Sequence, residues 1–157
     1  MAVMSYATPA DLQQRYSEAE LRQTSDSYGQ QVDIGRLEVA LADATDEIDG
    51  YLSGRYQLPL MDAEQRELAA PPVLVRGACD IAMYRLQTLR TADDVKDARR
   101  RYDDVIALLK RIREGEVTLA GAATLALGGE LGGVGGGSVE FNIPAVPPFS
   151  PFARTER

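Results

Sequence analysis

The side chains that carry most enzyme chemistry are scarce in this chain of 157 residues. It has no histidine, which excludes the Ser-His-Asp and Cys-His nucleophile arrangements and any metal site that needs an imidazole. Its single cysteine, Cys79, allows neither an internal disulfide nor a CxxC pair, as is typical of a reducing compartment. Cys79 lies in an apolar stripe without cationic neighbours, so we expect it to pack in the core. The sequence predicts no enzymatic activity and no cofactor.

Clustered carboxylates are the next candidates, because converging acids can bind a metal ion or exchange protons. The chain places Asp43, Asp46, Glu47 and Asp49 along one short stretch. A hard cation needs several converging oxygens, and no second cluster completes such a set, so no metal site is predicted. We interpret the stretch as the acidic outer face of a helix. Three of its members, Asp43, Asp46 and Glu47, are candidates for electrostatic contact with a neighbouring copy.

A run of basic residues at Arg99, Arg100 and Arg101 could mark a nucleic-acid surface. Acidic residues lie three or four positions away, among them Asp97 and Asp103, and this spacing pairs opposite charges along a helix. A paired, solvated face is therefore the main interpretation. The functional alternative is a contact between subunits or with DNA in the lumen of a ring.

Beyond residue 115 the composition shifts to glycine and proline, and the motif GGELGGVGGG fills residues 128–137. A phosphate-binding loop would need Lys-Ser/Thr and a following helix; neither follows the motif, which is therefore predicted to be a linker. Residues 138–143, SVEFNI, alternate apolar and polar side chains as a strand does. Residues 144–152, PAVPPFSPF, are polyproline-like and carry two phenylalanines.

Large apolar side chains in such a tail have no core of their own to enter, so we interpret them as docking residues. The tail is predicted to add a strand to a partner's sheet edge and to fill apolar pockets beyond it. The docking residues are Val139, Phe141, Ile143, Phe149 and Phe152. The alternative is a frayed end without a partner.

The rest of the chain must supply the fold, and its periodicity predicts helices. Thr8 before Pro9 begins one short helix, and Ser17 with Glu20 begins another. The polar residues 24–32 are predicted to form a loop.

Asp33 then caps a long helix that is expected to end near Ser53. Its apolar residues recur every three or four positions, which places them on one helical face. They are Leu37, Leu41, Ala44, Ile48 and Tyr51. The GRYQLPL motif at 54–60 is predicted to be extended because Pro59 restricts the backbone, and residues 62–69 are a candidate short helix.

Two more helices follow, one from Pro71 and Pro72 to about Leu89 and one from Ala92 to a glycine stop at Gly115. The same spacing predicts the buried face of each. For the first helix the expected residues are Leu74, Ala78, Ile81, Ala82, Arg85 and Leu89. For the second they are Val95, Ala98, Tyr102, Val105, Leu109 and Ile112.

These patterns predict an all-α fold, a small bundle of two long antiparallel helices and a third long helix with short N-terminal helices. The expected divisions are 1–32 for the short helices and loop, 33–115 for the helical core, and 116–157 for a flexible Gly/Pro-rich tail.

The net charge of −7 resides in residues 1–50, which hold 10 acids and 3 bases. Such a charge disfavours free nucleic acid or an anionic membrane as the main partner. No apolar run reaches the roughly 18 residues of a membrane helix.

Several motifs together resemble a known family. The segments MSYATPADLQQRY, IDGYLSGRYQLPL, PPVLVRGACDIAMYRL and RRYDDVIALLKRIREGEVTL are similar to those of Mu-like tailed-phage head–tail connector, or adaptor, proteins. The resemblance covers about residues 4–120, with the GRYxLPL run between two helices as its most specific part, and it leaves out the Gly-rich extension. It implies an all-α adaptor that forms a ring under the portal and joins the DNA-filled head to the tail.

The resemblance also implies the partners. They would be further copies of the chain in a ring, the portal protein, a downstream head–tail joining or tail protein, and DNA passing through the lumen. The protein would be made in the host cytoplasm and reside at the head–tail junction of the virion, without a membrane partner. Two other roles stay open: a stopper or tail-completion protein in the same particle, and an acidic module that mimics DNA.

Overall fold

The computed structural model describes residues 5–26, 28–88 and 95–125, all of which lie in one unit, Met1–Leu127. These residues fold as five helices and contain isolated β-bridges in place of named strands. The helices are α1 (Pro9–Arg15), α2 (Glu18–Ser25), α3 (Ile34–Leu52), α4 (Pro72–Thr88) and α5 (Lys96–Glu114). The predicted all-α fold is confirmed.

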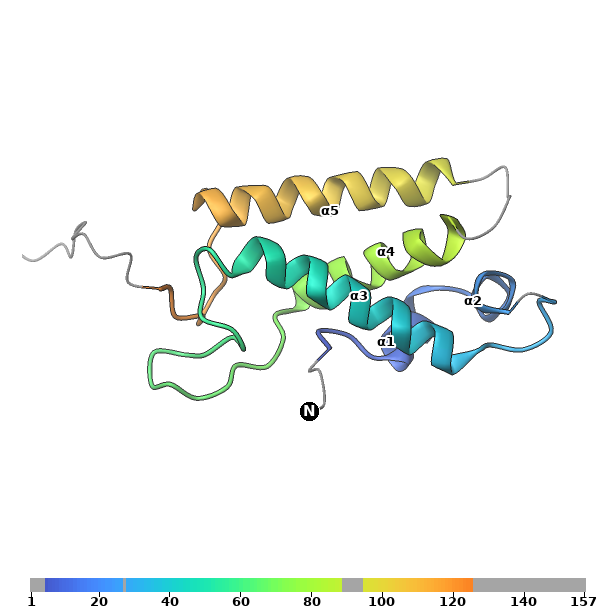
Figure 1. The fold of residues 1–157 in the computed structure, drawn as a ribbon, viewed down its shortest axis with the longest axis horizontal. Coiled ribbons are helices and arrows are strands. Elements are labelled where there is room, and N and C mark those ends of the chain that lie inside the picture. The colour runs from blue at the N-terminus through green and yellow to red at the C-terminus, as the bar shows by residue number, and fades with distance from the viewer. Residues whose placement is uncertain (1–4, 27, 89–94, 126–157) are drawn as a thin grey trace, which may run out of the picture. The chain divides into compact units, whose positions relative to one another are not determined.

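The long helices α3, α4 and α5 pack against one another, and Figure 1 shows α5 on one side of the α3–α4 pair with α1 and α2 on the other. Most of the predicted core residues are buried, among them Leu37, Leu41, Ile48, Ile81, Val105 and Leu109, whereas Tyr51 and Val95 are only partly buried. Tyr102, also predicted to be inside, is only half-buried because its hydroxyl turns to a polar partner on α3. Leu89, expected to be buried, lies outside the described residues.

The two short helices begin where their caps predict. Thr8 and Asp11 exchange hydrogen bonds in a capping box, and Ser17 Oγ accepts from the Glu20 amide at 3.2 Å. The predicted loop begins too early, because α2 continues to Ser25. The Ser25 hydroxyl is buried, donates to Leu21 O at 2.6 Å and accepts from the Asp33 amide, which holds this last turn in place.

Two boundaries of the long helices also follow the sequence, whereas the last helix begins at Lys96, after Val95, and not at Ala92 as predicted. The Asp33 side chain accepts from the Arg36 amide at 3.1 Å and caps α3. Gly115 ends α5 in the left-handed region with φ 86° and donates to the carbonyls of Arg111 and Ile112. The guanidinium of Arg55 lies against Gly115, in the space that a Cβ atom at this position would enter.

The segment between α3 and α4 is neither extended nor helical, so both predictions for it are wrong. Turns occupy residues 53–55 and 58–60, and the Leu58–Pro59 peptide is cis. Residues 61–67 form a loop closed by an antiparallel bridge. Its Asp62 carboxylate accepts from the amides of Glu64 and Arg66, both at 2.9 Å. These local bonds satisfy backbone donors that a helix would have used and thus favour the turn.

Residues 116–125, assigned to the tail by composition, fold back onto this segment. Leu119 is buried, and its amide donates to the hydroxyl of the buried Tyr56 at 3.0 Å. The Leu125 amide donates to Arg55 O at 2.8 Å, beside a bridge between Tyr56 and Thr124. Each irregular segment supplies the backbone partners that the other lacks.

Candidate interaction surfaces

The acidic stretch on α3 divides into paired and outward side chains. Glu47, predicted to lie on the outer face, is 17% exposed and accepts hydrogen bonds from Arg85 at 2.7 Å and Tyr102 at 2.6 Å. The prediction of an outward Glu47 is therefore wrong, because the carboxylate faces Arg85 of α4 and Tyr102 of α5. Arg85, predicted to be buried, is 41% exposed at the same place, since its charge needs the carboxylate and solvent.

This Glu47–Arg85–Tyr102 junction shifts the protonation equilibria of its members. The hydrogen bond to Glu47, together with burial, raises the pKa of Tyr102 to about 12. The same carboxylate raises the pKa of the Arg85 guanidinium. The ring of Tyr102 also stacks on Tyr84, with centroids 4.5 Å apart. Because both Glu47 oxygens and the Tyr102 hydroxyl are engaged within the fold, the junction serves to join three helices.

The other acidic residues of α3 differ in their exposure to solvent and in their partners. Asp49 accepts a hydrogen bond from the Tyr6 hydroxyl, and partial burial raises the pKa of its carboxyl. Asp43 and Asp46 are exposed, and Asp43 lies 3.5 Å from the Arg85 guanidinium. Together with the exposed Glu38, they form what we call the α3 acidic face.

A second buried carboxylate, Asp80 of α4, was not singled out from the sequence. It is 7% exposed, accepts from the Tyr16 hydroxyl at 2.6 Å, and lies 3.6 Å and 3.9 Å from the Nε atoms of Arg76 and Arg101. Burial and this hydrogen bond raise the pKa of Tyr16. The available signal was an acid inside the apolar run ACDIAM, since a charge on a buried helix face needs a partner.

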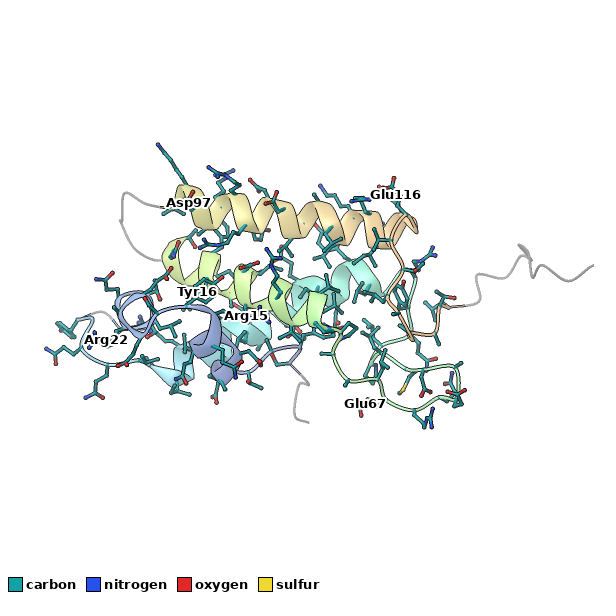
Figure 2. All side chains as sticks on the ribbon, turned by 180° about the vertical axis from the view of Figure 1, so that it is seen from behind. Arg15, Tyr16, Arg22, Glu67, Asp97 and Glu116 are labelled. Atoms are coloured by element: carbon teal, nitrogen blue, oxygen red, sulfur yellow. The ribbon has the colours of Figure 1, made fainter. Side chains whose placement is uncertain are left out.

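Arg101 is accordingly only partly outward, with its side chain 38% exposed, and the prediction of an outward residue holds only in part. Its guanidinium lies over the ring of Tyr16, 5.7 Å from the centroid, and it ties α5 to the end of α1. Figure 2 shows Tyr16 beside the long helices on the rear of the molecule. Arg99 and Arg100 are exposed and pair along the helix with Asp103 at 3.9 Å and Asp97 at 3.6 Å. The predicted pairing within the helix is confirmed for these two residues.

The outward faces of α3 and α5 have opposite charge. Among the exposed residues, α3 has three acids and one base, whereas α5 has six bases and four acids. The exposed bases of α5 form what we call the α5 basic face: Lys96, Arg99, Arg100, Lys110, Arg111 and Arg113. One helical unit thus presents two unlike surfaces, which can meet when different faces of two molecules come together.

The remaining candidates from the sequence are Cys79, the docking residues of the tail, and the acidic residues considered as metal ligands. Cys79 is fully buried as predicted, and burial raises the pKa of its thiol to about 11, so it is unreactive at neutral pH. The predicted docking residues at 139–152 lie outside the described residues. In the described part of the chain, no three acidic or cysteine side chains converge as metal ligands would. None of the helices described there has the length and apolarity to cross a membrane.

Comparison with known proteins supports the Mu-like phage part of the resemblance. The Mu-like prophage FluMu protein gp36 of Haemophilus influenzae is 36% identical over 115 residues, which is 73% of this chain and 74% of that protein. Gene product J of Escherichia phage Mu is 33% identical over 118 residues, covering 72% of this chain and 74% of that protein. The family model described as bacteriophage Mu, Gp36 matches residues 6–130. This chain therefore belongs to the bacteriophage Mu Gp36 family.

Proposed function

We propose that this protein is a structural component of the virion, a head–tail adaptor whose copies form a ring between the portal and the tail. The observation that carries the proposal is the pair of unlike outward surfaces, the α3 acidic face and the α5 basic face, on one helical unit. Membership in a Mu-like phage family supplies the particle in which such a ring would act.

A ring needs heterologous contacts, in which one surface of a subunit meets a different surface of the next. Opposite charge on the two faces supports this arrangement, because the acidic face of one copy can meet the basic face of the next. Exposed charges contribute more to orientation and association rate than to affinity, so apolar contacts must supply the rest. Residues 126–157 hold three phenylalanines and provide candidates for those contacts.

In this proposal the tail docks on the portal or on an adjacent copy, and DNA passes through the ring. The protein performs no catalysis. The DNA-mimic alternative has less support, because Glu47 and Asp49 are engaged in hydrogen bonds within the fold and do not extend the outward negative charge.

The proposal is tested by locating the protein in particles. Virions assembled with an epitope-tagged copy of the full chain should bind gold-labelled antibody at one head vertex, where the tail joins. Masses of the purified head–tail complex should show many copies per particle, arranged as a closed ring. Label along the tail, or particles without the protein, would contradict the proposal, and a terminal ring one layer further from the portal would identify a stopper or tail-completion role.

A further inference from the structure

The outward face of α3 carries an apolar side chain at its centre. Val39 is 64% exposed, and Gly35 and Asp43, one turn before and after it, are exposed as well. A β-branched side chain has a lower helix propensity than alanine or lysine and gains nothing from contact with water. Folding of one unit does not account for a valine at this position, whereas burial against another molecule would.

The charges around Val39 follow a fixed order along α3. Arg36 precedes it by three residues, and Asp43 and Asp46 follow it by four and seven residues. All of these side chains are exposed, and their spacing places them on the same side of the helix. Glu38 is also exposed, but it points about 100° away from Val39, toward the edge of the face. The centre of the face is therefore basic, apolar and acidic in turn.

The outward face of α5 has the reverse order. The exposed Ala107 lies at its centre, with Asp103 and Asp104 four and three residues before it and Lys110 and Arg111 three and four residues after it. The small side chain of alanine, between longer charged ones, leaves room for a valine from another helix, as in knobs-into-holes packing. This face is acidic, apolar and basic in turn.

The two orders match when the helices run in the same direction. With Val39 of one copy against Ala107 of the next, the base before Val39 lies near the acids before Ala107, and the acids after Val39 lie near the bases after Ala107. Reversing one helix would place like charges together at both ends. Glu114, near Asp46 in the matched direction, is the like charge that remains, and the neighbouring bases outnumber it.

The geometry of a ring requires the same direction. Within one unit, Glu47 of α3 contacts Tyr102 of α5, and further along both helices Arg55 lies against Gly115. The two helices thus run toward the same end of the unit, as Figure 1 shows. In a closed ring of six or more copies, each copy is rotated by no more than about 60° from the last. Helices α3 of one copy and α5 of the next therefore keep nearly the same direction.

The charges on these faces are available for a partner. Asp46, Asp104 and Lys110 form no ion pair within the part of the chain that the structure describes. The Asp43 carboxylate lies 3.5 Å from the Arg85 guanidinium, and about half of its side chain is exposed. Exposed pairs of this kind contribute little to stability, so they can rearrange when another molecule approaches.

We propose that α3 of one copy packs in parallel against α5 of the next, with Val39 seated on Ala107 and with Asp43 and Asp46 beside Lys110 and Arg111. This inference rests on the proposed function. It adds the direction of the contact between copies, its apolar centre and the charges that select that direction.

The first test restores the contact by charge reversal in the full-length chain. Asp43→Asn with Asp46→Lys makes the α3 face basic, and Lys110→Glu with Arg111→Glu makes the end of α5 acidic. Each variant should self-associate at least about tenfold more weakly than the wild type, and their mixture should regain association. Sedimentation at about 0.15 M salt measures this, because the Debye length of about 8 Å restricts the effect to neighbouring charges.

Arg99→Glu with Arg100→Glu is the matched control, since it makes the same change of charge at the other end of α5. At about 0.15 M salt it should not restore association of the α3 variant, although at low salt every base of the α5 basic face contributes. Rescue by this control in place of the Lys110 and Arg111 variant would overturn the parallel direction. Rescue by neither, with helical circular dichroism unchanged, would overturn the contact.

The second test locates the apolar centre in purified particles. A chain with Val39→Cys and Ala107→Cys should form a ladder of disulfide-linked multimers on oxidation, because facing residues bring their Cα atoms within about 7 Å. The control is Tyr28→Cys with Ala107→Cys, which moves one thiol to an exposed site off α3 and should give no ladder. Absence of a ladder from particles that contain the Val39→Cys, Ala107→Cys chain would overturn the contact.

These outcomes are separate from those that test the proposed function. If the protein locates to the head vertex and no ladder forms, the adaptor role stands and the parallel contact fails. If the protein is missing from the vertex while the two charge-reversed variants associate in solution, the adaptor role fails and the contact stands.

Discussion

The two ends of the helical unit hold their connecting segments in different ways. In the described part of the loop between α2 and α3, side-chain hydrogen bonds join residues 2 to 11 positions apart, the longest being the contact of Arg36 with Ser25 O. At the other end, the Leu119 amide reaches the Tyr56 hydroxyl across 63 positions. The loop at the first end is organised by neighbours in the sequence. The second forms only when both chain segments have been brought together, at the cost of closing a long loop.

The largest loss of stability is expected from mutation of Tyr56, which pairs with the distant Leu119. Tyr56→Ala removes a fully buried ring and should cost about 3–5 kcal/mol of unfolding free energy, as for other large aromatic truncations. Urea denaturation monitored by circular dichroism measures this loss. The matched change at the other end, Tyr28→Ala, should alter stability by no more than about 0.5 kcal/mol because that ring is exposed. Equal losses for the two tyrosines would contradict the contrast between the ends.

A smaller loss of stability is expected from mutation of Gly115, where the Arg55 guanidinium lies against the end of α5. Gly115→Ala places a Cβ in the left-handed region and against the guanidinium, so it should cost at least about 1 kcal/mol. Gly50→Ala is the control, because Gly50 is within α3 and has open space around it, and this change should be neutral or stabilising. A higher midpoint of thermal unfolding for Gly115→Ala than for the wild type would contradict this prediction. It would show that the backbone at Gly115 and the Arg55 side chain move aside without a loss of stability.

The N-terminal end of the unit should lose stability when the Thr8 cap of α1 is removed. Thr8→Ala breaks the capping box and should cost about 1 kcal/mol. The hydrogen bonds from Thr8 hold the pKa of Asp11 below its usual value, so their stabilising effect is present above the unfolded-state pKa and is lost as the pH falls. The difference between Thr8→Ala and wild type should therefore shrink below about pH 4 in urea titrations. A difference that is independent of pH would remove Asp11 from the cap.

The smallest change in stability is expected on the outward faces. Asp46→Lys alters an exposed charge and should change unfolding free energy by about 0–1 kcal/mol while weakening association of copies at low salt. Combining it with Arg99→Glu and Arg100→Glu should restore association if the α3 acidic face meets the α5 basic face. Glu64→Lys, in the loop between α3 and α4, is the control. Sedimentation that is unaffected by Asp46→Lys at every salt concentration would contradict the electrostatic contact.

The same contrast explains what the sequence could and could not predict. The caps at Thr8, Ser17, Asp33 and Gly115 depend on residues within a few positions, so their patterns predicted the helix boundaries. The fold of residues 116–125 depends on Tyr56 and its neighbours, which composition alone does not connect. The prediction of an outward acidic stretch failed at Glu47 and Asp49 for the same reason, because helical spacing cannot show that Arg85 or Tyr6 will reach these carboxylates.

The Glu47–Arg85–Tyr102 junction has an evolutionary consequence. Replacing the carboxylate alone leaves a guanidinium and a phenol without their common acceptor, and replacing Arg85 alone leaves a partly buried acid without its counterion. Each single step is unfavourable, whereas an exchange of all three for apolar residues of similar volume is tolerable. Drift at these positions should therefore be correlated. Among homologous sequences, positions 47, 85 and 102 are expected to be retained as a set or lost as a set.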